Sequence, residues 1–198
     1  FRNEELYRIN LLQCRPMRAK TDAVVTEPPM GLSDEDRIID SWGPVIGSSR
    51  DVSVNRIIYV VASEYSELAL NDRYAIAKLI GELAGGGPGE SSRQTLIVGP
   101  GRWGTTEPFL GVPISFAEIR TACAVCEIVT MREGLTPDVS LGTHFFNELV
   151  ETDILYFALY PDREEDFLNR DLLESGSNKL TDLLPDAARW APVVRVLD

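Results

Sequence analysis

Apolar residues along this chain change between the continuous runs of buried strands and the spaced pattern of helices. Residues 56–62, 94–98 and 122–130 are runs rich in apolar and β-branched side chains, and each predicts a strand. Between residues 63 and 83 the apolar positions recur at helical spacing, and a glycine-rich stretch at 85–89 ends the pattern. The order strand, helix, strand predicts a crossover unit and hence an α/β protein.

Shorter patterns predict the remaining elements. They are an edge strand over 5–16, a linker over 17–36, a short strand or hairpin over 38–47, a short helix over 115–120 opened by an S-x-x-E capping box, a turn at 134–138, a short helix within 142–149, a strand over 153–160, a helix over 161–173 and a final strand over 193–197. We therefore predict an α/β fold in which helices flank a mixed sheet.

A glycine-rich loop directly follows the predicted strand at 94–98. Three glycines let the backbone approach a ligand closely, and a guanidinium beside free amides suits a phosphate or a carboxylate. The predicted anion-binding residues are Gly99, Gly101, Arg102, Gly104, Thr105 and Thr106. A structural interpretation stays open, in which the glycines only permit a turn, Trp103 packs in the core and Arg102 pairs with an acidic residue.

The same glycines spell G-x-G-x-x-G, the dinucleotide-binding pattern, which requires a helix to begin at the loop. Pro108, Gly111 and Pro113 follow within ten residues. A proline inside a helix costs roughly 3 kcal/mol. We therefore expect no helix after the loop and reject nicotinamide-cofactor binding.

His144, the only histidine, is the candidate catalytic residue. Its side chain titrates near neutrality, so it suits a general acid or base, a phosphate acceptor or an anion ligand. Because it precedes two phenylalanines, a structural role is the alternative. Glu107, Glu118, Glu127 and Asp138 cannot be ranked from the sequence alone.

The chain has 198 residues, of which 44% are hydrophobic, so it is large enough to bury a core. Its formal net charge of −12 argues against nucleic acid or an anionic membrane as the main partner, because both require a positive surface. The apolar runs are shorter than the ~20 residues that span a bilayer. We expect a cytoplasmic protein, and because the sequence begins with Phe1, we expect a piece of a longer polypeptide.

The three cysteines, Cys14, Cys123 and Cys126, do not form a disulfide framework. Cys123 and Cys126 have C-x-x-C spacing, but in a strand residues three apart point to opposite faces. We predict buried structural thiols and no metal site.

Two blocks of sequence resemble a known family. The first block comprises residues 99–104 (GPGRWG) and continues through 109–114 (FLGVPI) and 142–147 (GTHFFN). It resembles the C-terminal region of proteins related to phosphoenolpyruvate synthase and pyruvate phosphate dikinase. Residues 11–16 (LLQCRP) are similar to the Q-x-R-P motif that ends the ATP-binding domain of that family, and 42–61 bear a limited resemblance to the start of its swivelling domain.

The resemblance implies a domain division and a nucleotide site. Residues 1–20 would be the terminal strand of a preceding ATP-grasp-like domain plus a linker, and 21–198 an α/β C-terminal domain. Gln13 and Arg15 would belong to the nucleotide and magnesium site, with ATP and Mg²⁺ bound only by the full-length protein. The family's phosphate-carrying T-S-H-A-type motif does not occur here, and residues 142–145 (GTHF) resemble it only superficially.

Two functions are therefore expected from the sequence. The first is the C-terminal domain of a dikinase-like phosphotransferase that binds a small anionic metabolite through the glycine loop, and is inactive in isolation. The alternative is a non-catalytic regulatory or docking module that senses a phosphorylated or carboxylate metabolite, or simply packs against the upstream ATP-binding domain of the same polypeptide.

Overall fold

The computed structural model describes residues 27, 29, 31–47, 50–85, 94–130, 138–140 and 143–198. Several predicted features lie outside the described residues: the strand over 5–16, most of the turn at 134–138, and the residues Gln13, Cys14 and Arg15.

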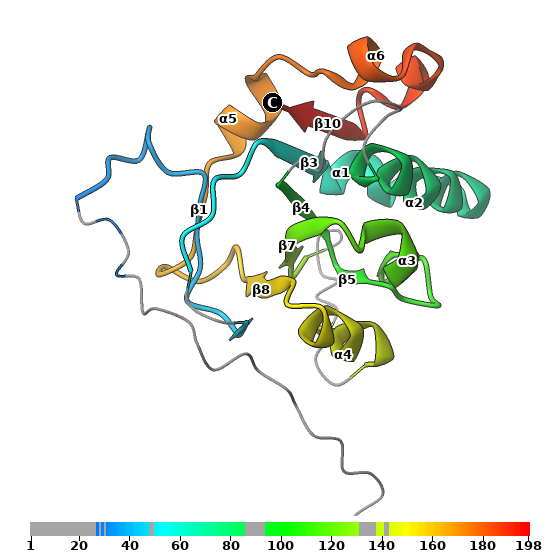
Figure 1. The fold of residues 1–198 in the computed structure, drawn as a ribbon. Helices are drawn as coiled ribbons and strands as arrows, with labels where there is room; N and C mark the ends of the chain where they lie inside the picture. Colours follow the sequence, from blue (N-terminus) through cyan, green and yellow to red (C-terminus); the bar gives the residue numbers. More distant parts are fainter. Residues whose placement is uncertain are drawn as a thin grey trace, which may run out of the picture.

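A six-stranded mixed sheet forms the centre of the molecule, in the order β10-β3-β4-β7-β8-β2 (Figure 1). The four central strands are parallel to one another: β3 (Arg56–Val60), β4 (Thr95–Pro100), β7 (Ala122–Ile128) and β8 (Leu155–Leu159). Two antiparallel strands, β10 (Val194–Leu197) and β2 (Val45–Ile46), lie at the edges. The predicted α/β class with a mixed sheet is confirmed.

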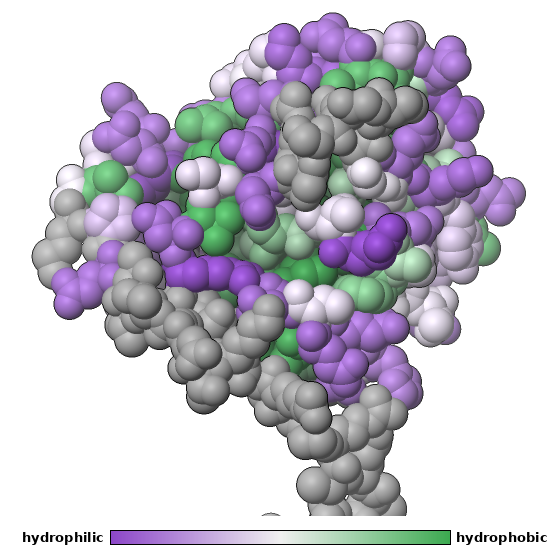
Figure 2. Space-filling model, viewed as in Figure 1, coloured by the Kyte–Doolittle hydropathy of each residue, from purple (hydrophilic) through white to green (hydrophobic). Residues whose placement is uncertain are grey.

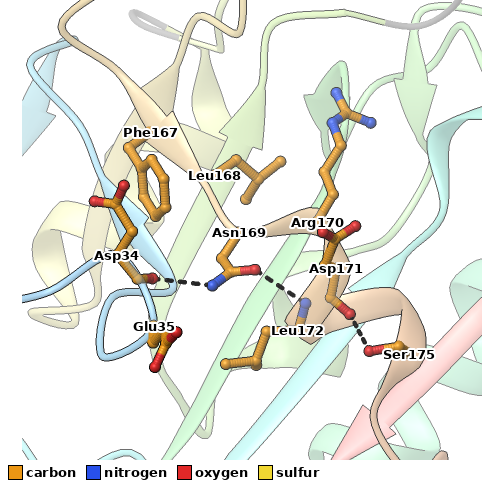
Figure 3. Close-up of a pocket in the computed structure, with 9 residues that line it drawn as sticks. All are labelled: Asp34, Glu35, Phe167, Leu168, Asn169, Arg170, Asp171, Leu172 and Ser175. Carbon is orange, nitrogen blue, oxygen red and sulfur yellow. Dashed lines mark hydrogen bonds between the residues drawn. The ribbon is translucent and has the colours of Figure 1, made fainter.

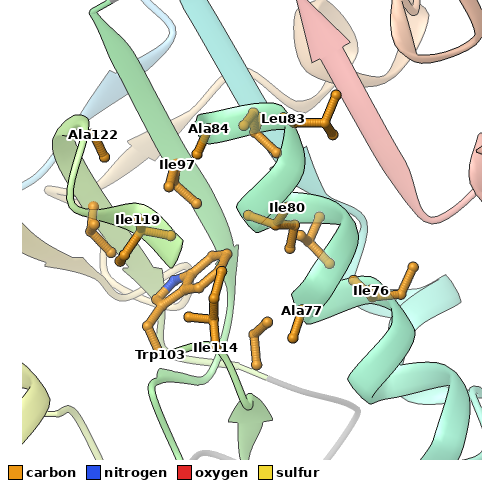
Figure 4. Close-up of a cluster of buried hydrophobic side chains, with 14 of the residues drawn as sticks. Ile76, Ala77, Ile80, Leu83, Ala84, Ile97, Trp103, Ile114, Ile119 and Ala122 are labelled. Carbon is orange, nitrogen blue, oxygen red and sulfur yellow. The ribbon is translucent and has the colours of Figure 1, made fainter. Parts of the chain in front are cut away.

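Helices cover one face of this sheet (Figure 1). They are α1 (Ala62–Ser66) and α2 (Leu70–Ala84) after β3, α3 (Phe116–Ile119) after β4, and α4 (His144–Glu151) after β7. The Ser115 and Glu118 side chains form the predicted capping box of α3. Apolar side chains of α2 and α3 pack against those of the sheet in one core cluster, which Figure 4 shows around Ile80, Ile97 and Ile119.

The chain crosses the opposite face between β8 and β10. There β1 (Ile39–Asp40) pairs with β9 (Phe167–Leu168), and α5 (Arg170–Ser175) follows. The chain then returns to the first face, where α6 (Leu180–Leu183) and the 3₁₀ helix η1 (Pro185–Trp190) join the core cluster of α2. Leu173 of α5 packs on Tyr59 and Val98, so the parallel strands are buried on both sides. Strands buried on both sides explain the continuous apolar runs in the sequence.

Two predicted helices were wrong in detail, and one of two alternatives was decided. The single helix over 63–83 is two helices, because the chain leaves helical geometry between α1 and α2, where Arg73 binds the carbonyls of Ser66 and Leu68. Of the short strand or hairpin predicted over 38–47, short strands are present, and they do not form a hairpin because each pairs with a distant strand. The helix over 161–173 is a turn, then β9, then α5, because the Asp166 carboxylate binds the backbone amides of Trp42 and Tyr160.

The surface in Figure 2 is mainly hydrophilic at its margins, with hydrophobic side chains gathered nearer the middle. Within the described residues, every helix is too short or too polar to cross a membrane.

Candidate functional site

The glycine loop continues β4 and turns sharply into two short strands. Gly99 and Pro100 still belong to β4, and the chain turns at Gly101, whose φ is 64°. Next, β5 (Arg102–Trp103) pairs in parallel with β6 (Gly111–Val112). The expectation that no helix begins at the loop is confirmed.

The amides of this loop donate hydrogen bonds to acceptors within the protein. Those of Gly101, Arg102 and Gly104 donate to the carbonyls of Ile128, Leu110 and Val112 at 2.8, 2.9 and 3.0 Å. The Trp103 amide donates to Glu127 Oε1 at 2.9 Å. These four amides are therefore not open to an external anion in this structure.

Glu127 of β7 is the acceptor of the Trp103 amide and of three further donors. Its Oε1 accepts hydrogen bonds from the Trp103 amide and the Ser140 hydroxyl, and its Oε2 accepts from the Ser140 amide at 2.9 Å and the Tyr156 hydroxyl at 2.6 Å. Each oxygen thus receives one backbone N–H and one hydroxyl. Glu127 is 1% exposed, and burial raises the pKa of its carboxyl group, while the hydrogen bonds from Ser140 and Tyr156 oppose that rise.

Packing around Trp103 keeps water away from this network. The indole is fully buried, and its Nε1 donates to the Cys126 carbonyl at 3.1 Å. Figure 4 shows it beside Ile114 and Ile119. The structural interpretation of the loop predicts that Trp103 packs in the core and that Arg102 pairs with an acidic residue. Both are observed, and the partner of Arg102 is Asp138.

The glycines of the motif are required by close packing. A Cβ atom at Gly99 would lie 2.6 Å from the Trp103 ring, and one at Gly111 would lie 1.9 Å from the Arg102 carbonyl oxygen. Gly104 faces the ring of Phe145 in α4. The described parts of the three sequence blocks, residues 99–104, 109–114 and 143–147, are therefore parts of one packed unit.

The charged end of the loop is at the surface. Arg102 Nε donates to the Asp138 carbonyl at 2.7 Å, and Nη2 lies 3.4 Å from the Asp138 carboxylate, which is 94% exposed. Thr106 is exposed, and the Thr105 hydroxyl accepts a hydrogen bond from the Glu107 amide at 3.0 Å. Among the predicted anion ligands, Thr106 is thus exposed and Arg102 keeps partial access to solvent.

His144 is the first residue of α4 and is exposed. Thr143 caps the helix by accepting a hydrogen bond from the Phe146 amide, and Phe145 is buried against Gly104. The structure therefore places the segment that carries His144 beside the glycine loop, with its imidazole accessible.

Cys123 and Cys126 are free thiols on opposite faces of β7. The Cys123 thiol donates to the Thr95 carbonyl at 3.3 Å, while Cys126 lies in the core. Burial raises the pKa of both thiols, that of Cys126 most strongly. Among the described residues, no group of three or more His, Cys, Asp or Glu side chains is placed to hold a metal ion.

A separate hollow of about 600 Å³ lies between residues 34–35 and α5 (Figure 3). The Asn169 amide group donates to the carbonyl oxygens of Asp34 and Arg37 at 3.1 and 3.2 Å, and its side-chain oxygen caps α5. Three acidic residues, Asp34, Glu35 and Asp171, outnumber Arg170 in its lining, which disfavours the anionic metabolite that the sequence predicts.

The topology also bears on where a ligand binds. In doubly wound sheets a crevice opens at the carboxyl ends of the strands where the strand order reverses. Here the parallel strands β3, β4, β7 and β8 are added in one direction. Among the described strands, the order of these parallel strands therefore has no such reversal point.

No family model, curated protein or solved structure matches this chain.

Proposed function

We propose that this chain is a non-catalytic docking or regulatory module of a larger, dikinase-like ATP-binding protein. The observation that carries the proposal is the filled glycine loop: its amides donate to three backbone carbonyls and to the Glu127 carboxyl group. A site that stabilises a transferring group holds its donors ready for the reacting atoms. A loop whose donors are used internally is instead suited to hold a surface in a fixed shape.

The upstream ATP-binding domain of the same polypeptide is the proposed partner. This assignment follows from the sequence resemblance, in which the Q-x-R-P block precedes the present fold. ATP and Mg²⁺ would then act in the full-length protein, through a site that includes Gln13 and Arg15. The module would bind neither by itself.

A second candidate function is binding of a small phosphorylated or carboxylate metabolite by Arg102, as in the phosphotransferase hypothesis. The specific observation in its favour is that the partner carboxylate of Arg102 is almost fully exposed and 3.4 Å away. Exposed ion pairs contribute at most about 1 kcal/mol, so an anion of higher charge can displace Asp138. The exposed His144 would then serve as proton or phosphate acceptor.

A thermal-shift titration with phosphate, phosphoenolpyruvate, pyruvate and MgATP separates these functions. A ligand at 100 times its Kd stabilises a fold by about 2.7 kcal/mol, which is about 5 to 10 °C for a domain of this size. The docking function predicts no shift with any of them. Metabolite binding would instead be established if one anion shifts the melting temperature, Arg102→Ala abolishes the shift, and Glu148→Ala on the exposed face of α4 preserves it.

The intact polypeptide provides the second arm of the test. If this module only docks, His144→Ala leaves ATP-dependent turnover near that of the wild type. Loss of turnover in a variant that keeps its thermal stability would overturn the docking function and make His144 a catalytic residue.

A further inference from the structure

The donors around Glu127 come from three separate parts of the chain. Trp103 belongs to β5, Ser140 to residues 138–140, and Tyr156 to β8. The Ser140 hydroxyl also lies 3.2 Å from the Trp103 carbonyl oxygen, so Ser140 touches β5 directly as well as through the carboxyl group. Glu127 is therefore a common partner of all three segments, beside the direct hydrogen bonds from Arg102 to Asp138.

These donors are selective for one chemical group. Two of them are backbone amides, which cannot become acceptors, and all four point at a pair of oxygen atoms held in one plane by the carboxyl carbon. The partners from β5, residues 138–140 and β8 are all uncharged donors. A planar carboxyl group satisfies every one of them, whereas a tetrahedral phosphate would carry two further oxygens into the buried surroundings of Trp103.

We propose that Trp103, Ser140 and Tyr156 form a carboxyl-binding site whose ligand is the side chain of Glu127, and that the occupied site is a latch. It holds β5 and residues 138–140 together and so fixes the surface pair Arg102–Asp138. Removing the internal ligand opens the site to a small external carboxylate. This inference shares the Trp103–Glu127 hydrogen bond with the docking function, but its test uses a Glu127 variant and acetate, so its failure leaves the docking function untouched.

Acetate is the matched probe, because Glu127→Ala removes the Cγ, Cδ and two oxygen atoms that acetate carries. We expect Glu127→Ala to lower the melting temperature, and acetate to raise it again along a saturable curve. Wild type and Glu148→Ala, which removes an exposed glutamate from α4, should show only the small, non-saturating effect of added salt. Phosphate at equal ionic strength should restore less than acetate does.

Equal stabilisation of Glu127→Ala and wild type by acetate, or equal rescue by phosphate, would overturn the proposal. If Glu127→Ala does not fold, Tyr156→Phe removes a single donor and keeps the carboxyl group. Native-state hydrogen exchange should then become faster at both the Trp103 and Ser140 amides, by a similar factor of about ten. The Thr152 amide donates to the Glu148 carbonyl at the C-terminal end of α4, and its exchange rate should not change. Acceleration at only one of the two amides would exclude the latch.

Discussion

Gly104 lies directly against the ring of Phe145: a Cβ atom at Gly104 would be 2.3 Å from Phe145 Cγ. The backbone φ of Gly104 is 69°, a left-handed conformation that disfavours a side chain. Gly104→Ala therefore combines backbone strain with a steric clash in the core. We expect it to lower the free energy of unfolding by about 2 to 4 kcal/mol, measured by urea denaturation.

Gly31→Ala is the matched control for this prediction. Gly31 has a φ of 75°, close to that of Gly104, but a Cβ atom there would meet no heavy atom within 4 Å. Gly31→Ala reports the backbone strain alone, so its effect should be about 1 kcal/mol. If the two variants lose equal stability, the contact between Gly104 and Phe145 is not significant.

Glu127→Gln is expected to destabilise the protein although it keeps the size of the side chain. Each carboxyl oxygen accepts a hydrogen bond from one backbone N–H, that of Trp103 or that of Ser140. In glutamine an NH₂ group replaces one oxygen, and because it cannot accept, one of these two N–H groups loses its acceptor. An unsatisfied buried donor costs about 1 to 3 kcal/mol. Urea denaturation near pH 5 measures the loss, and Glu148→Gln on the surface of α4 should change little.

The advantage of Glu127 over glutamine should depend on pH. Burial raises the pKa of Glu127 above its ordinary value of 4.5, so the folded protein holds this proton more tightly than the unfolded chain does. The contribution of Glu127 to stability is therefore fully present below pH 4.5 and falls as pH rises through the raised folded pKa. The wild-type free energy of unfolding, minus that of Glu127→Gln, should decrease over this range. An increase with pH would mean that the four donors outweigh burial.

The sequence predicted the sheet better than it predicted the site, for a physical reason. The strands β3, β4 and β7 are buried on both faces, so their apolar runs are visible without knowledge of their neighbours. The role of Glu127 depends on Ser140 and Tyr156, which approach only in the folded chain. Its one local sign was a charged residue inside an apolar run, between Cys126 and Ile128.

Short elements were harder to predict because distant residues determine them. β1 and β2 have two residues each, and their partners are β9 and β8. The charged stretch after Pro161 has the composition of a helix start, but Asp166 binds backbone amides of residues far apart in sequence. Such long-range hydrogen bonds override local propensity.

Arg73 was not singled out by the sequence, yet it connects α1, α2 and the loop before β6. It is 3% exposed, and its guanidinium donates to the carbonyls of Ser66, Leu68 and Pro108. It also lies 4.8 and 4.9 Å from the centres of the Tyr65 and Phe109 rings. A lysine ammonium cannot span three carbonyls in this planar arrangement.

We therefore expect Arg73→Lys to lower the free energy of unfolding by about 1 to 3 kcal/mol. Lys78→Arg makes the reverse exchange at an exposed position of the same helix and should be nearly neutral. Chemical denaturation of the two variants checks the prediction. Equal effects would show that the hydrogen bonds of Arg73 contribute little.

The cysteines provide a test of burial that needs no ligand. Alkylation requires both access to the thiol and its thiolate form. Cys126 is fully buried with a strongly raised pKa, and Cys123 is half-buried with a raised pKa. In a Cys14→Ser background, iodoacetamide should therefore modify Cys123 slowly and Cys126 only after unfolding. Mass spectrometry of the native and urea-unfolded protein distinguishes the sites, and rapid native labelling of Cys126 would contradict its place in the core.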